Sequence, residues 1–282
     1  MKPLVSIIIT CYNKKPYLET TLESVERQTY ANLEVILVDD GSNDGSRDVL
    51  EQYAASHGNV SLVFQSNQGV SAARNAGINV SNGEFIMSLD ADDRIEPTYV
   101  ERCVEVLEKH SEVKVVQTRA SYFGDKTGEF KVPEYSYEGL LWTNLIHYCA
   151  MYRRGDFLCT KGYNTNMVHG LEDWDFWLSM LQPEDLVFCV DEALFHWRVL
   201  SNSRSIEAEQ NEMECYRQLF HNHSELYAPY ADRLVYFREK WSQCDTLYHQ
   251  AMMMRQSKAY RIGKAITRPM SFLKGLFAKK QD

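Results

Sequence analysis

The sequence predicts an α/β protein in which a mostly parallel central sheet is flanked by helices. Short apolar runs, typical of buried strands, recur through the first half of the chain. The segments between them carry apolar residues at helical spacing, and several runs end in polar or acidic residues. Because parallel strands are joined by crossover helices, this alternation favours successive βαβ units.

Five apolar runs are the expected strands, and a helix is predicted after each of the first four. The strands lie at residues 4–9, 33–38, 60–64, 84–89 and 113–118. The helices begin at Pro16, cover residues 46–57 and 70–80, and begin again at Pro97. Proline in the first turn is a start signal for a helix, which supports the first and last of these.

The second half of the chain is less regular and richer in aromatic residues. Gly124 and Gly128 predict a hairpin or loop. The run "LEDWDFWLSML" at residues 171–181 predicts a helix with an acidic first turn, which the helix dipole favours. Beyond Ser205, two helical stretches separated by Pro229 predict a C-terminal helical appendage.

These patterns predict two domains. The first covers residues 1–205 and consists of two halves, residues 1–118 and residues 119–205. The second is a helical extension over residues 206–282.

Charge is distributed unevenly along the chain. Residues 251–282 contain eight Lys or Arg and one acid, whereas the whole chain has a net charge of −9, so the rest is strongly acidic. An acidic body argues against nucleic-acid binding, which depends on neutralising phosphates with Lys and Arg. The tail mixes cations with apolar residues, a pattern typical of binding to a membrane surface through residues 255–280. A solvated or oligomer-forming helix is an equally good interpretation.

The expected compartment is the cytoplasm. The seven cysteines are scattered without a C-x-x-C pair, which favours neither a zinc site nor a disulfide framework. No signal-peptide pattern is visible at the start, and the apolar run there is far shorter than the ~20 residues of a membrane span. We expect a soluble protein whose membrane contact, through the tail, is peripheral and on the inner face of the plasma membrane.

A cluster of acids follows the fourth expected strand. The segment "SLDADDRIEP" places Asp90, Asp92 and Asp93 within four residues. Like charges this close raise each other's pKa unless a cation lies between them. Mg²⁺ and Mn²⁺ bind through one or two carboxylates together with substrate phosphates. Two interpretations stay open from the residues alone, a metal and phosphate site or a solvated turn that caps the next helix.

The first two strands also end in polar residues, at positions 10–13 and 39–42. Ligands of parallel α/β sheets bind beyond the carboxyl ends of the strands, so polar groups from three strands are expected to share one edge. The sequence lacks the G-x-x-x-x-G-K-[ST] and G-x-G-x-x-G fingerprints of P-loop and dinucleotide sites. A nucleotide bound at this edge would need a divalent metal to neutralise its phosphates.

Four segments, in order, resemble family 2 of the inverting nucleotide-sugar glycosyltransferases, which have the Rossmann-like GT-A fold. They cover about residues 4–200 and read "VSIIITCYNKKPYLETTLESVERQTYANLEVILVDDGSNDGS", "NQGVSAARNAGI", "GEFIMSLDADD" and "RRGDFLCTKGYN…GLEDWDFWL". The resemblance implies inverting transfer of one sugar from a UDP-linked donor to a glycan or lipid-linked glycan in bacterial surface polysaccharide synthesis. It makes residues 1–118 the nucleotide-binding half and residues 119–205 the acceptor-side half. The Q-x-x-R-W signature of processive relatives is absent.

The resemblance also implies a donor site. Thr10, Tyr12 and Asp40, with Asp39 beside them, match positions that hold the nucleobase: a tyrosine ring can stack on the base and a carboxylate can accept its imide N–H. Arg74 matches a residue near the nucleotide phosphates, and the alternative for Arg74 is an ordinary ion pair on a helix face.

For the metal, the resemblance implies Mn²⁺ or Mg²⁺ bound by Asp90 and Asp92, which match the family's D-x-D motif. Family members often carry a later histidine that completes the metal site, but Leu200 occupies that place here. His196 lies four residues earlier, and residues four apart on a strand share a face. His196 is therefore the candidate third ligand.

Glu172 and Asp173 match the family's E-D pair, whose second acid is the general base. The alternative is N-terminal capping of the helix. Trp174, with Glu172, is a candidate wall of a sugar or acceptor pocket, and for a tryptophan at this spacing a core position is the alternative.

Two other functions stay open. A nucleotidyltransferase that makes an activated sugar would carry a Gly-rich loop with Arg or Lys after the first strand, and "TCYNKKPYL" has no glycine. A non-catalytic nucleotide-binding module would not need Asp90, Asp92 and Asp173.

Overall fold

The computed structural model describes residues 2–200, 208 and 210–230. The chain divides into two compact units, Met1–Leu226 and Tyr227–Asp282, and the sheet lies in the first. Among the helices described, none combines the length and the hydropathy that a membrane crossing needs. The basic tail at residues 255–280 lies outside the described residues.

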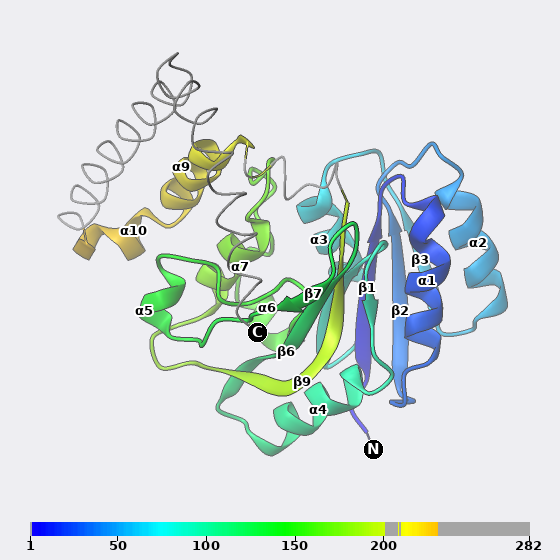
Figure 1. The fold of residues 1–282 in the computed structure, drawn as a ribbon, viewed down its shortest axis with the longest axis horizontal. Helices are drawn as coiled ribbons and strands as arrows, with labels where there is room; N and C mark the ends of the chain where they lie inside the picture. The colour runs from blue at the N-terminus through cyan, green and yellow to red at the C-terminus, as the bar shows by residue number, and fades with distance from the viewer. Residues whose placement is uncertain (1, 201–207, 209, 231–282) are drawn as a thin grey trace, which may run out of the picture. The chain divides into compact units, whose positions relative to one another are not determined.

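Four parallel strands form one half of the sheet (Figure 1). In sheet order they are β3 (Val60–Phe64), β2 (Leu33–Asp39), β1 (Val5–Cys11) and β4 (Phe85–Asp90). The crossover helices are α1 (Lys15–Glu26), α2 (Ser46–Ser56) and α3 (Val70–Val80). All neighbouring pairs among these strands are parallel, so the predicted βαβ organisation is confirmed.

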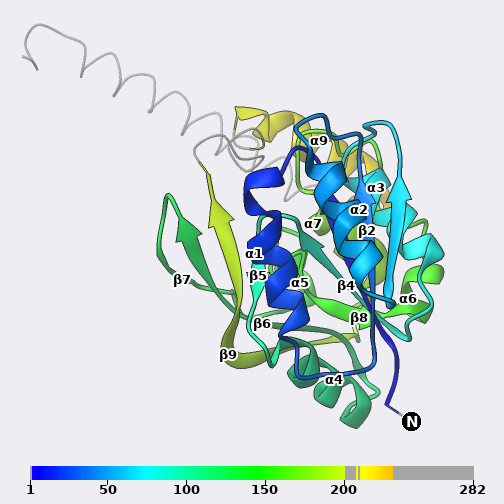
Figure 2. The same ribbon diagram turned by 90° about the vertical axis from the view of Figure 1, so that its right-hand side faces the viewer.

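The other half of the sheet is mixed. Beyond β4 the order continues with β8 (Met151–Arg153), β6 (Val113–Gly124), β9 (Leu186–Val199) and β5 (Arg94–Ile95). Strand β8 is antiparallel to both neighbours and β5 is antiparallel to β9, whereas β6 and β9 are parallel. A hairpin joins β6 to β7 (Gly128–Phe130), at the two glycines for which the sequence predicts a hairpin or loop. Figure 2 shows β7 and the end of β9 at the margin of the sheet.

Further helices follow the parallel half of the sheet. They are α4 (Tyr99–Lys109), α5 (Tyr137–Leu140), α6 (Arg154–Leu158), α7 (Glu172–Met180), α9 (Glu212–Asn222) and α10 (Ser224–Tyr227). The helix predicted over residues 171–181 corresponds to α7. The α/β fold class predicted from the sequence is confirmed.

Helices cover both faces of the parallel half. Ile7 and Ile9 of β1 pack in one core with side chains of α1, α2 and α4. Ile8 points to the opposite face, which α3 covers. A Cβ atom on Gly77 of α3 would lie 2.4 Å from Ile8 Cγ2 and 2.9 Å from Val38 Cγ2. Glycine therefore lets α3 approach the sheet at a distance that a side chain would prevent.

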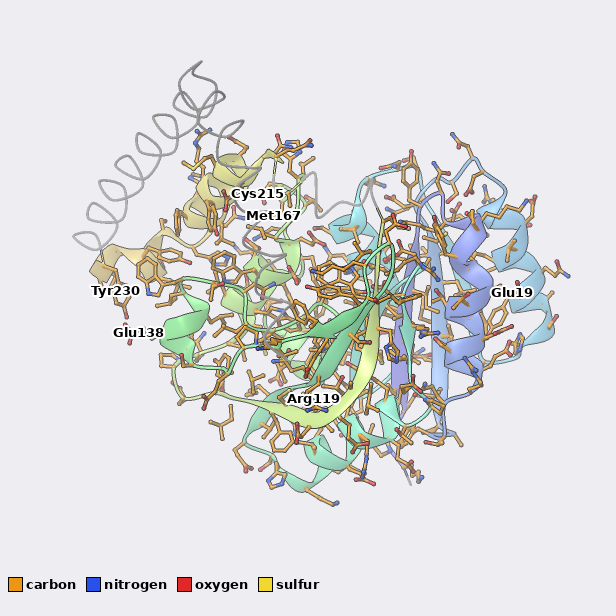
Figure 3. All side chains as sticks on the ribbon, viewed as in Figure 1. Glu19, Arg119, Glu138, Met167, Cys215 and Tyr230 are labelled. Atoms are coloured by element: carbon orange, nitrogen blue, oxygen red, sulfur yellow. The ribbon has the colours of Figure 1, made fainter. Side chains whose placement is uncertain are left out.

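A buried polar cluster joins α9 to α7. Asp175 on α7 is fully buried, and its Oδ1 accepts a hydrogen bond from Asn222 Nδ2 at 2.6 Å and lies 3.0 Å from His223 Nε2. Met167 and Cys215, which Figure 3 labels, line one small cavity. The first compact unit thus includes α9, which packs on the helix that begins at the E-D pair.

Candidate active site

The carboxyl ends of β1, β2 and β4 lie level at one edge of the sheet. In the pairing register, Thr10 of β1 is opposite Asp90 of β4, and Cys11 is opposite Asp39 of β2. The hydroxyl of Thr10 donates to Asp90 Oδ1 at 3.0 Å. The structure therefore brings together the polar strand ends that the sequence predicts to meet.

Arg74, on α3, links this edge to the start of α7. Its side chain is 1% exposed; Nη2 donates to Asp90 Oδ1 and Nη1 to Glu172 Oε1, both at 3.1 Å. The ring centroids of Tyr148 and Tyr163 lie 4.8 and 5.4 Å from its guanidinium carbon. Burial acts to lower the pKa of Arg74, but the pull of Asp90 and then Glu172 outweighs it and raises that pKa. One buried cation thus holds two acids from distant parts of the chain.

Asp92 forms an ion pair with Lys14, which follows β1. Lys14 Nζ and Asp92 Oδ2 are 2.5 Å apart, and the two side chains are 30% and 13% exposed. Burial raises the pKa of Asp92 against the pull of Lys14. The pair therefore lies at the edge of the sheet, within reach of solvent.

Asp93, the third acid of the cluster, is buried and hydrogen-bonded through both oxygens. The Tyr148 hydroxyl donates to Oδ2, and the backbone N–H of Arg198 donates to Oδ1 at 2.6 Å. Burial, followed by repulsion from Asp92 and Asp90, raises the pKa of Asp93 well above its usual range. Through these hydrogen bonds Asp93 stabilises the turn after β4.

Asp90 and Asp92 have the chemistry that Mg²⁺ or Mn²⁺ requires. Within the described part of the chain, no group of three or more His, Cys, Asp or Glu is arranged to hold a metal ion. Magnesium usually takes one or two carboxylates and completes its coordination with water and substrate phosphates. Asp90 is 33% exposed, and its hydrogen bonds from Thr10 and Arg74 both use Oδ1. A site of two carboxylates completed by phosphate oxygens therefore fits these residues.

Asp173 lies in the first turn of α7. Leu171, just before the helix, has a left-handed backbone with φ of 61°. The backbone N–H of Trp174 donates to Asp173 Oδ1 at 2.8 Å, and Asn144 Nδ2 donates to Oδ2 at 2.9 Å. Burial, followed by repulsion from Glu172, raises the pKa of Asp173 to about 6. A carboxylate with this pKa is ionised near neutral pH and is basic enough to take a proton from a hydroxyl group.

The residues expected around a nucleobase lie at the ends of β1 and β2. Tyr12 is 45% exposed, so its ring has surface available for stacking. Asp39 and Asp40 are both buried. The carboxylate of Asp40 accepts hydrogen bonds from the Gln65 side chain and from two backbone N–H groups at the start of α3, one of them that of Gly69. Asp40 thus ties the end of β2 to α3.

Two of the expected site residues make their contacts elsewhere. His196 on β9 has Nδ1 2.5 Å from the Ser121 hydroxyl and Nε2 2.6 Å from Glu96, so both ring nitrogens are engaged. Its place as third metal ligand stays a prediction. Trp174 is 2% exposed and its indole N–H donates to the Leu140 carbonyl at 2.6 Å, which places the ring in the core.

The sequence did not predict three residues that contact the acids of the site: Lys14, Tyr148 and Asn144. Lys14 lies in "CYNKK", two residues after Tyr12, and a search for cations near strand ends would have found it. Tyr148 and Asn144 belong to the irregular segment before β8. No local pattern marks them, because their contacts arise only when that segment folds against α7 and the end of β4.

Comparison with known proteins gives the family. The model of the family described as Glycosyl transferase family 2 matches residues 6–159, more than half of the chain. The chain is 39% identical over 120 residues to the putative glycosyltransferase EpsH of Bacillus subtilis, covering 43% of this chain and 35% of EpsH. It is 32% identical over 183 residues to a chondroitin synthase of Escherichia coli, covering 63% of this chain and 26% of the synthase. It is 31% identical over 203 residues to the putative glycosyltransferase EpsE of Bacillus subtilis, covering 70% of this chain and 73% of EpsE. The chain thus spans about a third or less of the first two relatives and most of EpsE.

Solved glycosyltransferase structures share the fold. TarS residues 1–349 of S. aureus, in complex with UDP-GlcNAc, align with a TM-score of 0.66 at 19% identity, covering 78% of this chain and 66% of TarS. The mannosyltransferase PcManGT of Pyrobaculum calidifontis, in complex with GDP-Man and Mn²⁺, aligns with a TM-score of 0.60 at 19% identity. The alignment covers 99% of this chain and 89% of PcManGT. These likenesses confirm the GT-A fold, and the family match shows that the chain belongs to glycosyltransferase family 2.

Proposed function

We propose that this chain is an inverting, metal-dependent glycosyltransferase that adds one sugar from a UDP-linked donor to a hydroxyl of a glycan or lipid-linked glycan. The observation that carries the proposal is the bridge from Asp90 through Arg74 to Glu172, the neighbour of Asp173. It joins the expected phosphate site to the expected base. Solved relatives in complex with UDP-GlcNAc, or with GDP-Man and Mn²⁺, support a nucleotide-sugar donor.

The acceptor class is inferred from the relatives. A chondroitin synthase of Escherichia coli supports a role in polysaccharide synthesis, which in this proposal builds a bacterial surface polysaccharide. Attachment of residues 255–280 to the inner face of the plasma membrane, outside the described residues, belongs to the same proposal. It would bring the enzyme to a lipid-linked acceptor.

In this proposal the nucleobase lies at the ends of β1 and β2. The exposed ring of Tyr12 stacks on the base, and the buried Asp39 shapes the site beside it. A carboxylate offers about four lone-pair positions, and three N–H groups donate to Asp40. One acceptor position of Asp40 is therefore left for the imide N–H of uracil.

The sugar transfer takes place between Asp90 and Asp173. Asp90 and Asp92 would hold Mn²⁺ or Mg²⁺, which supplies positive charge beside the departing diphosphate. Arg74 fixes the position of Asp90. Asp173 takes the proton of the acceptor hydroxyl as that oxygen bonds to the anomeric carbon. The bond from the anomeric carbon to the diphosphate oxygen breaks on the opposite face, so the configuration inverts.

Ligand binding tests the donor site directly. UDP together with Mn²⁺, near a hundredfold excess over the dissociation constant, is expected to raise the melting temperature by about 5–10 °C. Either ligand alone should have little effect, because the phosphates and the carboxylates need the ion between them. Differential scanning fluorimetry measures this. An equal shift with UDP in the presence of a chelator would contradict the metal-dependent site.

The pKa of Asp173, raised to about 6, predicts the pH dependence. The base acts only when ionised, so kcat/KM should rise with pH through about 6 and fall about tenfold per pH unit below it. The hydrogen bond from Asn144 acts to lower this pKa. Asn144→Ala should therefore move the acid limb to higher pH in assays between pH 4.5 and 8. A limb that stays in place or moves down would show that another group controls it.

A further inference from the structure

Lys14 lies where a divalent ion would bind. Its Nζ is 2.5 Å from Asp92 Oδ2, and the two residues are 78 positions apart in the sequence. Magnesium approaches its oxygen ligands to about 2.0–2.1 Å. An ammonium group this close to Oδ2 occupies the position of a metal ion at that oxygen and would repel it. The two cations therefore compete for Asp92 Oδ2.

The main chain at Lys14 is held by hydrogen bonds in which the Lys14 side chain takes no part. The backbone N–H of Lys14 donates to Ser46 Oγ at 3.0 Å, and that of Asn13 donates to Ser42 Oγ at 2.9 Å. The side chain of Lys14 is 30% exposed. Because lysine carries its charge on a flexible four-carbon stem, the ammonium can change partners while the connection from β1 to α1 stays in place.

The two cations that form ion pairs with carboxylates of the acid cluster, Lys14 and Arg74, differ in how firmly they are held. Burial acts to lower the pKa of Lys14, but the pull of Asp92, then Asp90 and Asp93, outweighs it, so Lys14 is charged. Arg74 is 1% exposed and bridges two acids, whereas Lys14 bonds one carboxylate near solvent. Lys14 is therefore the cation that can leave.

We propose that Lys14 is a displaceable counter-cation, which occupies Asp92 before the donor arrives and pairs with the donor's diphosphate once a divalent ion has taken Asp92. This inference rests on the proposed function, because it assumes that Asp92 binds the metal of a nucleotide-sugar donor. Both charged groups keep a partner in this exchange. The carboxylate of Asp92 binds the divalent ion in place of the Lys14 ammonium, and the ammonium binds phosphate oxygens in place of that carboxylate. The consequence is weak binding of the ion alone and strong binding of ion and nucleotide together.

The test measures Mn²⁺ binding alone by electron paramagnetic resonance, and UDP binding in saturating Mn²⁺ by calorimetry. Lys14→Met should bind Mn²⁺ alone about fivefold more tightly than wild type, because no ammonium competes. It should bind UDP with Mn²⁺ roughly tenfold more weakly, because a charged partner of the diphosphate is lost. Lys14→Arg should bind Mn²⁺ alone more weakly than wild type, since a guanidinium can hold a carboxylate through two N–H groups.

Lys15→Met is the matched control. It removes the same charge from the adjacent, exposed position and should change neither constant. Equal or weaker Mn²⁺ binding by Lys14→Met would overturn the inference while the proposed function stands, provided that wild type binds UDP with Mn²⁺. A wild-type protein that does not bind UDP in saturating Mn²⁺ would contradict the proposed function itself. If Lys14→Met does not fold, the order of wild type and Lys14→Arg in Mn²⁺ affinity decides.

Discussion

Replacing Asp173 with asparagine is expected to lower kcat about 10²–10⁴-fold, the range that a positioned general base contributes. Asparagine has nearly the same shape and can still accept the Trp174 N–H at the helix start. Its amide, however, cannot take the proton of an acceptor hydroxyl. Donor binding should persist, because Asp90, Asp92 and Arg74 are unchanged, so UDP with Mn²⁺ should shift the melting temperature as in wild type.

Single-turnover transfer of a labelled sugar at saturating donor measures the loss without interference from product release. The matched control is Asp191→Asn, the same chemical change at a side chain on β9 that is 91% exposed. It should keep the wild-type rate. Retention of more than about a tenth of kcat by Asp173→Asn would mean that another group takes the proton.

The parallel half of the sheet is predictable because each of its strands is a short, mostly apolar run. The pattern predicts a strand at residues 60–64 and a helix at 70–80, and the structure has β3 at Val60–Phe64 and α3 at Val70–Val80. The two-residue β5 and three-residue β8 are not predictable in this way. Ile95 is in a strand because it pairs with Phe195, a partner far along the chain. A local pattern holds no information about such a neighbour.

The acids of the site are predictable, whereas their partners are not. Asp90 and Asp173 occur in motifs at a strand end and a helix start, which single them out in the sequence. Glu172 accepts a hydrogen bond from Arg74, 98 residues away, and this contact exists only because the first residue of α7 lies beside α3 in the folded chain. Trp174 shows the converse, because its motif suggests a pocket wall and the packing of α7 buries its ring.

Replacing Arg74 with methionine is expected to destabilise the fold by about 3–5 kcal/mol, the cost of removing one partner from a buried ion pair. The change leaves Glu172, whose side chain is 12% exposed, and Asp90, at 33%, without their cation. Methionine fills much of the same space as arginine, so the loss of stability reflects the missing charge more than a change in side-chain volume. Urea denaturation at neutral pH, with the slope compared between variants, gives the free energy of unfolding.

Two comparisons isolate the bridge. Arg102→Met is the surface control: Arg102 and its partners Glu105 and Glu192 are 44%, 45% and 43% exposed, and the variant should lose little stability, because exposed ion pairs contribute little. In the double variant Arg74→Met/Glu172→Gln the more buried acid is no longer charged, so part of the lost stability should return, and comparison with both single variants should give a coupling energy of about 0.5–3 kcal/mol. If Arg74→Met costs no more than Arg102→Met, the bridge does not hold α3 to α7. Packing alone would then have to fix the position of Asp173 relative to the carboxyl ends of β1, β2 and β4.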